Sequence, residues 1–145
     1  MKKYLVILLL TGHCAMAQVN KALDDSLIRA YRASTNEFIS SHDVGGMSRY
    51  WLNGYTCIFS NGNKLISRDS SIAFWNRVFK QQPTIYYVRI PSEIIISEDG
   101  YTAWESGTWT GMNTKSKTGN YAATWNKLDN IWKLQTELYA TLSYY

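Results

Sequence analysis

The chain has 145 residues, with 15 Lys or Arg against 11 Asp or Glu and a formal net charge of +4. This length suffices for one domain around one hydrophobic core. The basic residues form no run or stripe, which argues against a nucleic-acid partner. With two histidines and two cysteines, no glycine-rich phosphate loop and no serine nucleophile elbow, we expect no metal and no cofactor.

The N-terminus has the features of a secretory signal peptide. Two lysines follow the first residue, an apolar run covers residues 4–10, and the small-residue site Ala15-Met16-Ala17 comes next. These features are typical of cleavable signals, and the run is too short to span a bilayer. We expect residues 1–17 to be removed and residues 18–145 to form a single exported domain, periplasmic or secreted, without a membrane span. The alternative is a buried N-terminal strand or helix.

The two cysteines lead to different expectations. Cys14 raises the question of a lipid-modified cysteine, but the residue before such a cysteine should be small and here it is His13. Cleavage after Ala17 is therefore favoured. Cys57 lies in an apolar, strand-like stretch with no histidine close in sequence, which favours a buried, inert thiol over a catalytic one.

The first half of the chain is predicted to contain most of the helices. Apolar residues recur at helical spacing from Leu23 to Phe38, which indicates an amphipathic helix. Asp43 is a suitable N-cap for a short second helix, and Asn61-Gly62 is a strong hairpin turn. The predicted elements are helices over residues 20–40 and 43–51, strands over residues 55–59 and 63–67, and a third helix from Asp69 to a point before Pro83.

The second half is predicted to be entirely strand. The turn sequences Asp99-Gly100 and Asp129-Asn130 connect neighbouring strands. The strands are expected over residues 84–97, 102–112, 118–127 and 131–142. Helices followed by a long antiparallel meander predict an α+β domain with a strongly twisted antiparallel sheet.

The turns also predict which side chains share a face of this sheet. A two-residue loop at Asp99-Gly100 sets Ile94 opposite Glu105 and Ile90 opposite Trp109. Continued through the later hairpins, the pairing places one acid, Glu105, on an apolar face with Val88, Ile90, Ile94, Ile96, Ala103, Trp109, Tyr121, Trp125, Leu134 and Leu138. The opposite face is expected to be polar, with Tyr87, Arg89, Glu93, Trp104, Ser106, Asn120, Lys133, Gln135 and Glu137.

Glu105 is the strongest candidate for a catalytic residue. A lone carboxylate among Trp, Tyr and Ile side chains is either paired or has its pKa raised by desolvation, and shifted pKa values are frequent at functional sites. Two interpretations stay open: a structural glutamate bonded to a helix residue or to Tyr121, or a group that faces a ligand. Tyr121 is the second catalytic candidate, because a buried hydroxyl needs a hydrogen-bond partner.

Other candidate residues have weaker support. His42 and Asp43 could form an acid–base pair at a pocket mouth, although helix capping already accounts for Asp43. Tyr31 and Tyr50 lie on predicted helices that face the sheet, where they either belong to the core or contact a ligand. The full set of expected ligand-binding residues is Tyr31, Tyr50, Ile90, Trp109 and Trp125.

Four segments of the C-terminal half resemble the nuclear transport factor 2-like superfamily. They are Trp104-Glu105-Ser106-Gly107-Thr108-Trp109, Gly119-Asn120-Tyr121, Trp125-Asn126-Lys127 and Trp132-Lys133. The pattern is most similar to the SnoaL-like and ketosteroid-isomerase-like bacterial branch, and the resemblance covers nearly all of residues 20–142. Family members often have an acidic residue where Glu137 stands, but the predicted pairing puts Glu137 on the face away from Glu105.

The resemblance implies a cone-shaped, cystatin-like fold. In that fold a curved sheet wraps around a long helix, a pocket opens at one end, and homodimers form through the outer face of the sheet. The family includes isomerases, dehydratases, epoxide hydrolases, polyketide cyclases and pocket proteins without known chemistry, so the fold alone assigns no activity.

Three functions are compatible with these observations. The first is an exported protein that binds a small, fairly apolar molecule in a pocket, since aromatic linings with a few polar groups are typical of such sites. The second is an enzyme that moves protons on a carbonyl-type substrate, with Glu105 as acid or base and Tyr121 as donor to an oxyanion. The third is a dimeric interaction module that uses aromatic residues of the outer face, namely Tyr87, Trp104 and Tyr139.

Overall fold

The structure is a computed structural model that describes residues 19–144. The expected signal peptide, its cleavage after Ala17 and the question of lipidation at Cys14 all concern residues outside this range. These three expectations therefore stay predictions.

Three helices form in the first half of the chain, and side chains cap each of them. They are α1 (Lys21–Ser40), α2 (Val44–Ser48) and α3 (Arg68–Gln81). The side chain of Asn20 accepts a hydrogen bond from the backbone of α1, and Asp43 does the same for α2, as predicted. Ser67 forms a capping box with Ser70 at the start of α3, which satisfies two backbone donors that a helix end otherwise leaves free.

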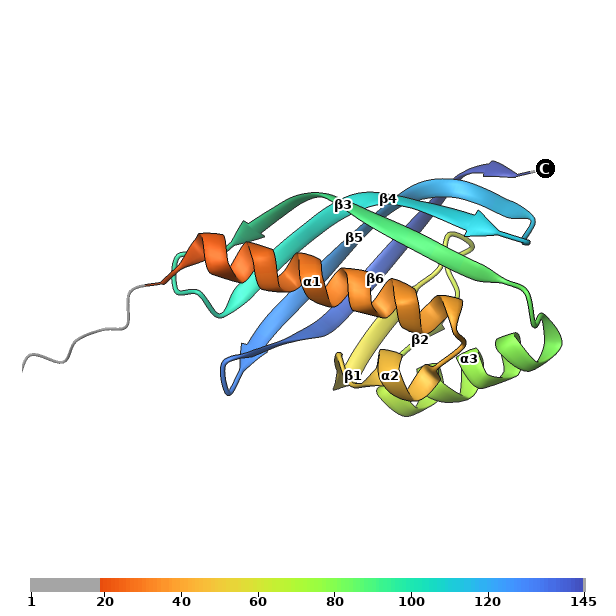
Figure 1. Ribbon diagram of the computed structural model, residues 1–145, viewed down its shortest axis with the longest axis horizontal. Coiled ribbons are helices and arrows are strands. Elements are labelled where there is room, and N and C mark those ends of the chain that lie inside the picture. Colours follow the sequence, from red (N-terminus) through yellow and green to blue (C-terminus); the bar gives the residue numbers. More distant parts are fainter. Residues whose placement is uncertain (1–18, 145) are drawn as a thin grey trace, which may run out of the picture.

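Six strands form one sheet in the order β2-β1-β6-β5-β4-β3 (Figure 1). The strands are β1 (Trp51–Ile58), β2 (Lys64–Leu65), β3 (Tyr86–Ile96), β4 (Thr102–Met112), β5 (Ser116–Leu128) and β6 (Ile131–Tyr144). Neighbouring strands are antiparallel except β1 and β6, which are parallel. The predicted α+β class is confirmed, and the expectation of a wholly antiparallel sheet is wrong at this one pair.

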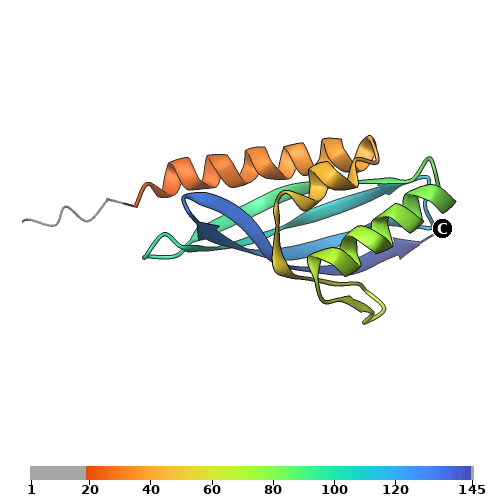
Figure 2. The same cartoon turned by 90° about the horizontal axis from the view of Figure 1, so that it is seen from below.

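The helices and the sheet form two layers. α1 runs along one face of the curved sheet (Figures 1 and 2). α2 and α3 lie near the edge of the sheet that β1 and β2 form. The chain enters α1 at the opposite end of the molecule from α3 (Figure 1). The core between the layers is centred on Ile28 of α1 and on Trp125, Trp132 and Leu134 of the sheet, all of them fully buried.

The buried face of α1 differs from the predicted apolar face. Leu23 is 54% exposed, whereas Asp24 and Arg32 are buried. The full buried set is Asp24, Ile28, Arg32, Thr35 and Ile39. A search for apolar spacing cannot find this face because three of its five members are polar or charged.

A bulge in β3 changes the predicted pairing of the sheet. Ile94 pairs with Glu105 as expected, but the register shifts between Pro91 and Glu93, and Arg89 rather than Ile90 lies opposite Trp109. A shift of one residue turns every later side chain to the other face. Ile90 is therefore 60% exposed and Arg89 is buried, so the predicted faces of both residues are wrong.

A second irregularity lies in the β5–β6 hairpin. Trp125 pairs with Leu134 as predicted, but after the shift beside Thr124 the partner of Tyr121 is Tyr139 and not Leu138. Glu137 is buried for the same reason, although the predicted pairing placed it on the outer face. Between β4 and β5 the pairing differs from the prediction by two residues, so Trp109, Tyr121 and Trp125 keep their predicted face.

Candidate functional site

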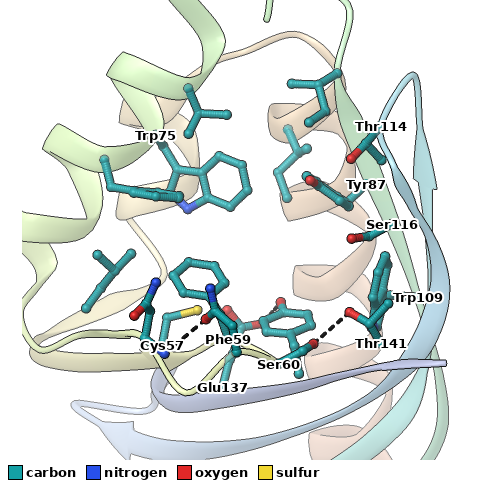
Figure 3. A pocket seen from close by; sticks show the side chains of 18 of the residues that line it. Cys57, Phe59, Ser60, Trp75, Tyr87, Trp109, Thr114, Ser116, Glu137 and Thr141 are labelled. Carbon is teal, nitrogen blue, oxygen red and sulfur yellow. Dashed lines mark hydrogen bonds between the residues drawn. The ribbon is translucent and has the colours of Figure 1, made fainter. Parts of the chain in front are cut away.

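A cavity of about 700 Å³ lies between α3, the β1–β2 hairpin and the ends of β3, β4, β5 and β6 (Figure 3). Its size is within the range of small-molecule sites. Ile39 in the last turn of α1 and Met47 of α2 also line it. The cavity therefore occupies the end of the molecule that is remote from the start of α1.

Aromatic rings line the cavity in a continuous row. Six lining side chains contact one another in turn, with centroid distances between 5.2 and 6.4 Å. In order they are Phe59, Phe74, Trp75, Tyr87, Trp109 and Tyr139. Distances in this range are those of favourable aromatic pairs, so the rings hold one another in place around the space.

Hydroxyl groups form part of the wall that faces Trp75. Tyr87, Thr114 and Ser116 point into the cavity from the strand side (Figure 3). Ser60 and Thr141 also line the cavity and their hydroxyl oxygens lie 2.7 Å apart, which links the β1–β2 turn to β6. The wall thus offers neutral hydrogen-bonding groups opposite an aromatic surface.

The inner end of the cavity contains an ion pair. The Nη1 atom of Arg89 donates to Glu137 Oε1 at 3.2 Å and to the Tyr139 hydroxyl at 3.4 Å. Tyr139 and Tyr55 both donate to the carboxylate of Glu137. All four residues line the cavity, so its inner end is polar but its groups are already bonded to one another.

A second ion pair lies behind the first, outside the cavity. Arg32 donates to Glu137 at 2.7 Å and, through Nε and Nη2, to both oxygens of Glu105 at 2.8 and 2.7 Å. Tyr121 donates to Glu105 at 2.5 Å and the indole of Trp125 at 2.6 Å. Two arginines and two glutamates thus form one buried network, defined here as Arg32, Arg89, Glu105 and Glu137, in which the charges balance.

The network lowers the pKa values of both carboxyl groups. Burial by itself would raise the pKa of Glu137, but the charges of Arg32 and Arg89 and the hydrogen bond from Tyr55 outweigh it and lower that pKa to about 2. Burial likewise opposes the ionised form of Glu105, and Arg32 again outweighs it, so the pKa of Glu105 lies below its ordinary value. A buried carboxylate is either paired or has a raised pKa, and Glu105 is paired with Arg32. Its pKa is lowered and not raised.

The structure separates the other predicted site residues. Trp109 lines the cavity, whereas Trp125 and Tyr121 lie behind it beside Arg32. Tyr31 and Tyr50 contact each other with ring centroids 5.0 Å apart and, like Ile90, are not among the lining residues.

His42 and Asp43 have structural roles outside the cavity. The Nε2 atom of His42 lies 2.8 Å from the carbonyl oxygen of Ile85, and its ring stacks on Phe79. The carboxylate of Asp43 accepts a hydrogen bond from the backbone of Gly46. The two side chains do not form a pair with each other, and neither lines the cavity.

Sequence reasoning missed the charged groups of the cavity. Arg89 and Glu137 were assigned to the outer face, and Arg32 was not singled out. The one available signal was the family resemblance, which marks an acidic residue at position 137. Tyr139 and Tyr87 were assigned to the outer face as well, and both line the cavity.

Cys57 also lines the cavity and is buried. Burial raises the pKa of its thiol to about 12, and the charge of Glu137 adds to this effect. The thiol is therefore protonated at neutral pH and weakly nucleophilic.

Residues 19–144 have neither a cluster of metal ligands nor a long apolar helix. No three His, Cys, Asp or Glu side chains in this range are grouped as a metal site would require. None of its helices combines the length and the hydrophobicity that a membrane-spanning helix needs.

The outer face of the sheet carries exposed apolar side chains. Trp104 is 46% exposed, and Ile95 and Leu138 are exposed as well. The homodimer that the resemblance implies through this face stays a prediction.

A family model for the SnoaL-like domain matches residues 28–136 of the chain. None of the curated proteins with which the chain was compared matches it. The match covers α1 from Ile28 onward, α2, α3 and the sheet as far as Thr136 of β6.

Solved structures of low sequence identity share the fold. A protein of Novosphingobium aromaticivorans, described as nuclear transport factor 2-like with a cystatin-like fold, superposes with a TM-score of 0.74 at 14% identity over 88% of this chain and 87% of that one. A domain of unknown function with a cystatin-like fold from Nostoc punctiforme gives a TM-score of 0.73 at 15% identity over 83% and 78%. A nuclear transport factor 2-like protein of unknown function from Shewanella oneidensis gives 0.71 at 16% identity over 81% and 98%. The predicted cystatin-like fold is confirmed.

Proposed function

This chain belongs to the SnoaL-like domain family, and we propose that it binds a small, largely apolar molecule in the cavity at the open end of its sheet. The observation that supports this proposal most strongly is the row of six contacting aromatic rings that lines a cavity of about 700 Å³. Small-molecule sites are concave and mostly apolar, with a few polar groups that orient the ligand. The hydroxyls opposite Trp75 supply such groups.

Acid–base chemistry by Glu105 and Tyr121 has less support. Glu105 is fully buried, accepts four hydrogen bonds and does not line the cavity. A general base has to reach the proton that it removes, directly or through one water. The lowered pKa of Glu105 also makes its carboxylate a weak base, so we retain ligand binding as the proposed function.

A neutral fluorescent dye can test the proposal. N-phenyl-1-naphthylamine is an apolar aromatic molecule, and we expect its fluorescence to rise on titration with the mature protein. The substitution Ser116→Trp places a large ring where a small side chain now points into the cavity (Figure 3). We expect it to weaken dye binding roughly 10- to 100-fold, because the added ring fills space that one aromatic group of the dye would occupy, and burying such a group is worth about 1.5–3 kcal/mol.

The matched control is Asn120→Trp. Asn120 lies on the same strand, is exposed and does not line the cavity, so dye binding should stay unchanged. Equal loss in both variants, or no binding by the unmodified protein, would count against the cavity as a site for apolar molecules.

We further propose that the protein acts outside the cytoplasm. The support is the charged start, the apolar run and the Ala15-Met16-Ala17 site of the sequence, which are the features of a secretory signal. Expressed in a Gram-negative host, the chain with residues 1–17 intact is expected in the periplasm with Gln18 as its first residue, as read by N-terminal sequencing. A variant without residues 2–17 should stay in the cytoplasm. An unprocessed cytoplasmic product from the intact chain would refute export.

A further inference from the structure

The charges around the cavity support an inference about the ligand, which rests on the proposed function. Among the described residues, the charged side chains that line the cavity are Lys64, Arg77, Arg89 and Glu137. Glu137 is the one acid of this set, and it is already paired with Arg89 and with Arg32 behind it. The lining therefore has an excess of positive charge, which lies on Lys64 and Arg77.

Lys64 and Arg77 come from different elements at the open end of the cavity. Lys64 belongs to β2 and Arg77 to α3, and both are exposed although they line the cavity. Across residues 19–144 no carboxylate lies within ion-pair distance of either side chain. The guanidinium of Arg77 lies 5.8 Å from the ring centre of Phe74, so one of the two positive charges lies beside the aromatic lining.

The inner end of the cavity does not suit an anion. The guanidinium of Arg89 donates to Glu137 and Tyr139 through Nη1. Its Nη2 and Nε atoms donate to Thr35 and Asn36. With these donors engaged and the carboxylate of Glu137 beside them, an anion at this end would meet balanced charges and no unpaired cation. A negative group therefore fits only at the open end.

We propose that the ligand is a carboxylic acid with an aromatic or other flat apolar body, bound as its anion. The apolar body packs among the rings of Trp75, Tyr87 and Trp109, and the carboxylate lies at the open end, where Lys64 and Arg77 supply the positive charge. A cleft with one sign of charge and low-dielectric walls concentrates ligands of the opposite charge, and ion pairs at the rim add selectivity for the acid over a neutral molecule of the same shape.

Two molecules that differ only in charge test this proposal. 2-Naphthoic acid and 2-naphthamide have the same ring system and nearly the same size, and their affinities for the mature protein can be measured by isothermal titration calorimetry. We expect the acid to bind about 10-fold more tightly at low ionic strength, the size expected for two partly exposed ion pairs. The preference should disappear in about 1 M salt, where the screening length is about 3 Å.

Paired double variants show whether the two lining cations cause the preference. Lys64→Gln with Arg77→Gln should abolish the preference, so that the ratio of the affinities for 2-naphthoic acid and 2-naphthamide falls to about 1, as two lost ion pairs predict. The control, Arg29→Gln with Lys80→Gln, removes the same charge from residues that do not line the cavity and should keep the preference.

The outcomes separate this inference from the proposed function. If both molecules bind with equal affinity, or the amide binds more tightly, the cavity still binds apolar molecules and the preference for a carboxylate is refuted. A preference that survives in the Lys64/Arg77 variant refutes the assigned position of the carboxylate. If neither molecule binds, and N-phenyl-1-naphthylamine does not bind either, the proposed function fails and this inference fails with it.

Discussion

Replacing Arg32 by methionine is expected to lower the free energy of unfolding by about 3–5 kcal/mol. Arg32 is fully buried and donates to both Glu105 and Glu137. Without it, Glu105 has no cationic partner and Glu137 keeps only Arg89 at 3.2 Å. Breaking a buried ion pair leaves an uncompensated charge in a medium of low dielectric constant, and this costs far more than the intact pair contributes. Because domains are stable by about 5–15 kcal/mol, this loss is a large fraction of the total stability.

Urea unfolding followed by tryptophan fluorescence measures this change. The matched control is Arg29→Met on the same helix, where the partner Asp25 is partly exposed and one turn away. Exposed pairs contribute about 1 kcal/mol or less, so this variant should resemble the unmodified protein. If both variants are equally stable, the buried carboxylates are not held in the ionised state by Arg32.

The stability of the protein is expected to fall steeply as the pH decreases from about 5 to about 2. The pKa of Glu137 is about 2 in the folded state against an ordinary value of 4.5. A depressed folded-state pKa contributes stability that is complete above the unfolded value and is lost as the pH falls through the folded value. A difference of this size corresponds to about 3 kcal/mol at neutral pH, and the lowered pKa of Glu105 acts in the same direction.

Glu137→Gln isolates the contribution of this residue. We expect the variant to be about 3 kcal/mol less stable than the unmodified protein at pH 7. The difference should shrink toward pH 3, because below the ordinary value of 4.5 the carboxyl group is protonated in the unfolded chain while it stays ionised in the folded one. Glu98→Gln serves as the control, because Glu98 is almost fully exposed and its removal should leave the pH profile unchanged. A constant difference between the unmodified protein and Glu137→Gln from pH 7 to pH 3 would contradict the lowered pKa.

The fold was predictable because its signals are local. Turn sequences such as Asp99-Gly100, helix caps such as Asp43 and alternating apolar residues all act over a few positions. The turn and the cap have their predicted roles in the structure, and the alternation marks the strands correctly. The order and spacing of the segments from Trp104 to Trp132 were enough to indicate the family. The parallel pairing of β1 with β6 was not predictable in this way, since residues such as Cys57 and Glu137 are far apart in the chain.

The candidate site was predicted less well for a physical reason. An alternating pattern assigns faces only while the register is continuous, and one extra residue beside Pro91 exchanges Arg89 for Ile90. The same kind of shift beside Thr124 turns Glu137 inward. Buried charges are also invisible to a hydrophobic pattern, because the pattern treats Arg32 as a surface residue. Such charges become acceptable in the interior only when partners from distant strands meet them, and this can be seen only in three dimensions.

The direction of α1 has a practical consequence for how the protein can be displayed. The helix has 20 residues and so extends about 30 Å, from Val19 just before it to Ile39, which lines the cavity. A linker joined ahead of Val19 would meet the molecule at the end opposite the cavity. Immobilised on a sensor surface in this orientation, the protein would keep its cavity facing the solution, so binding could be recorded without the surface obstructing entry.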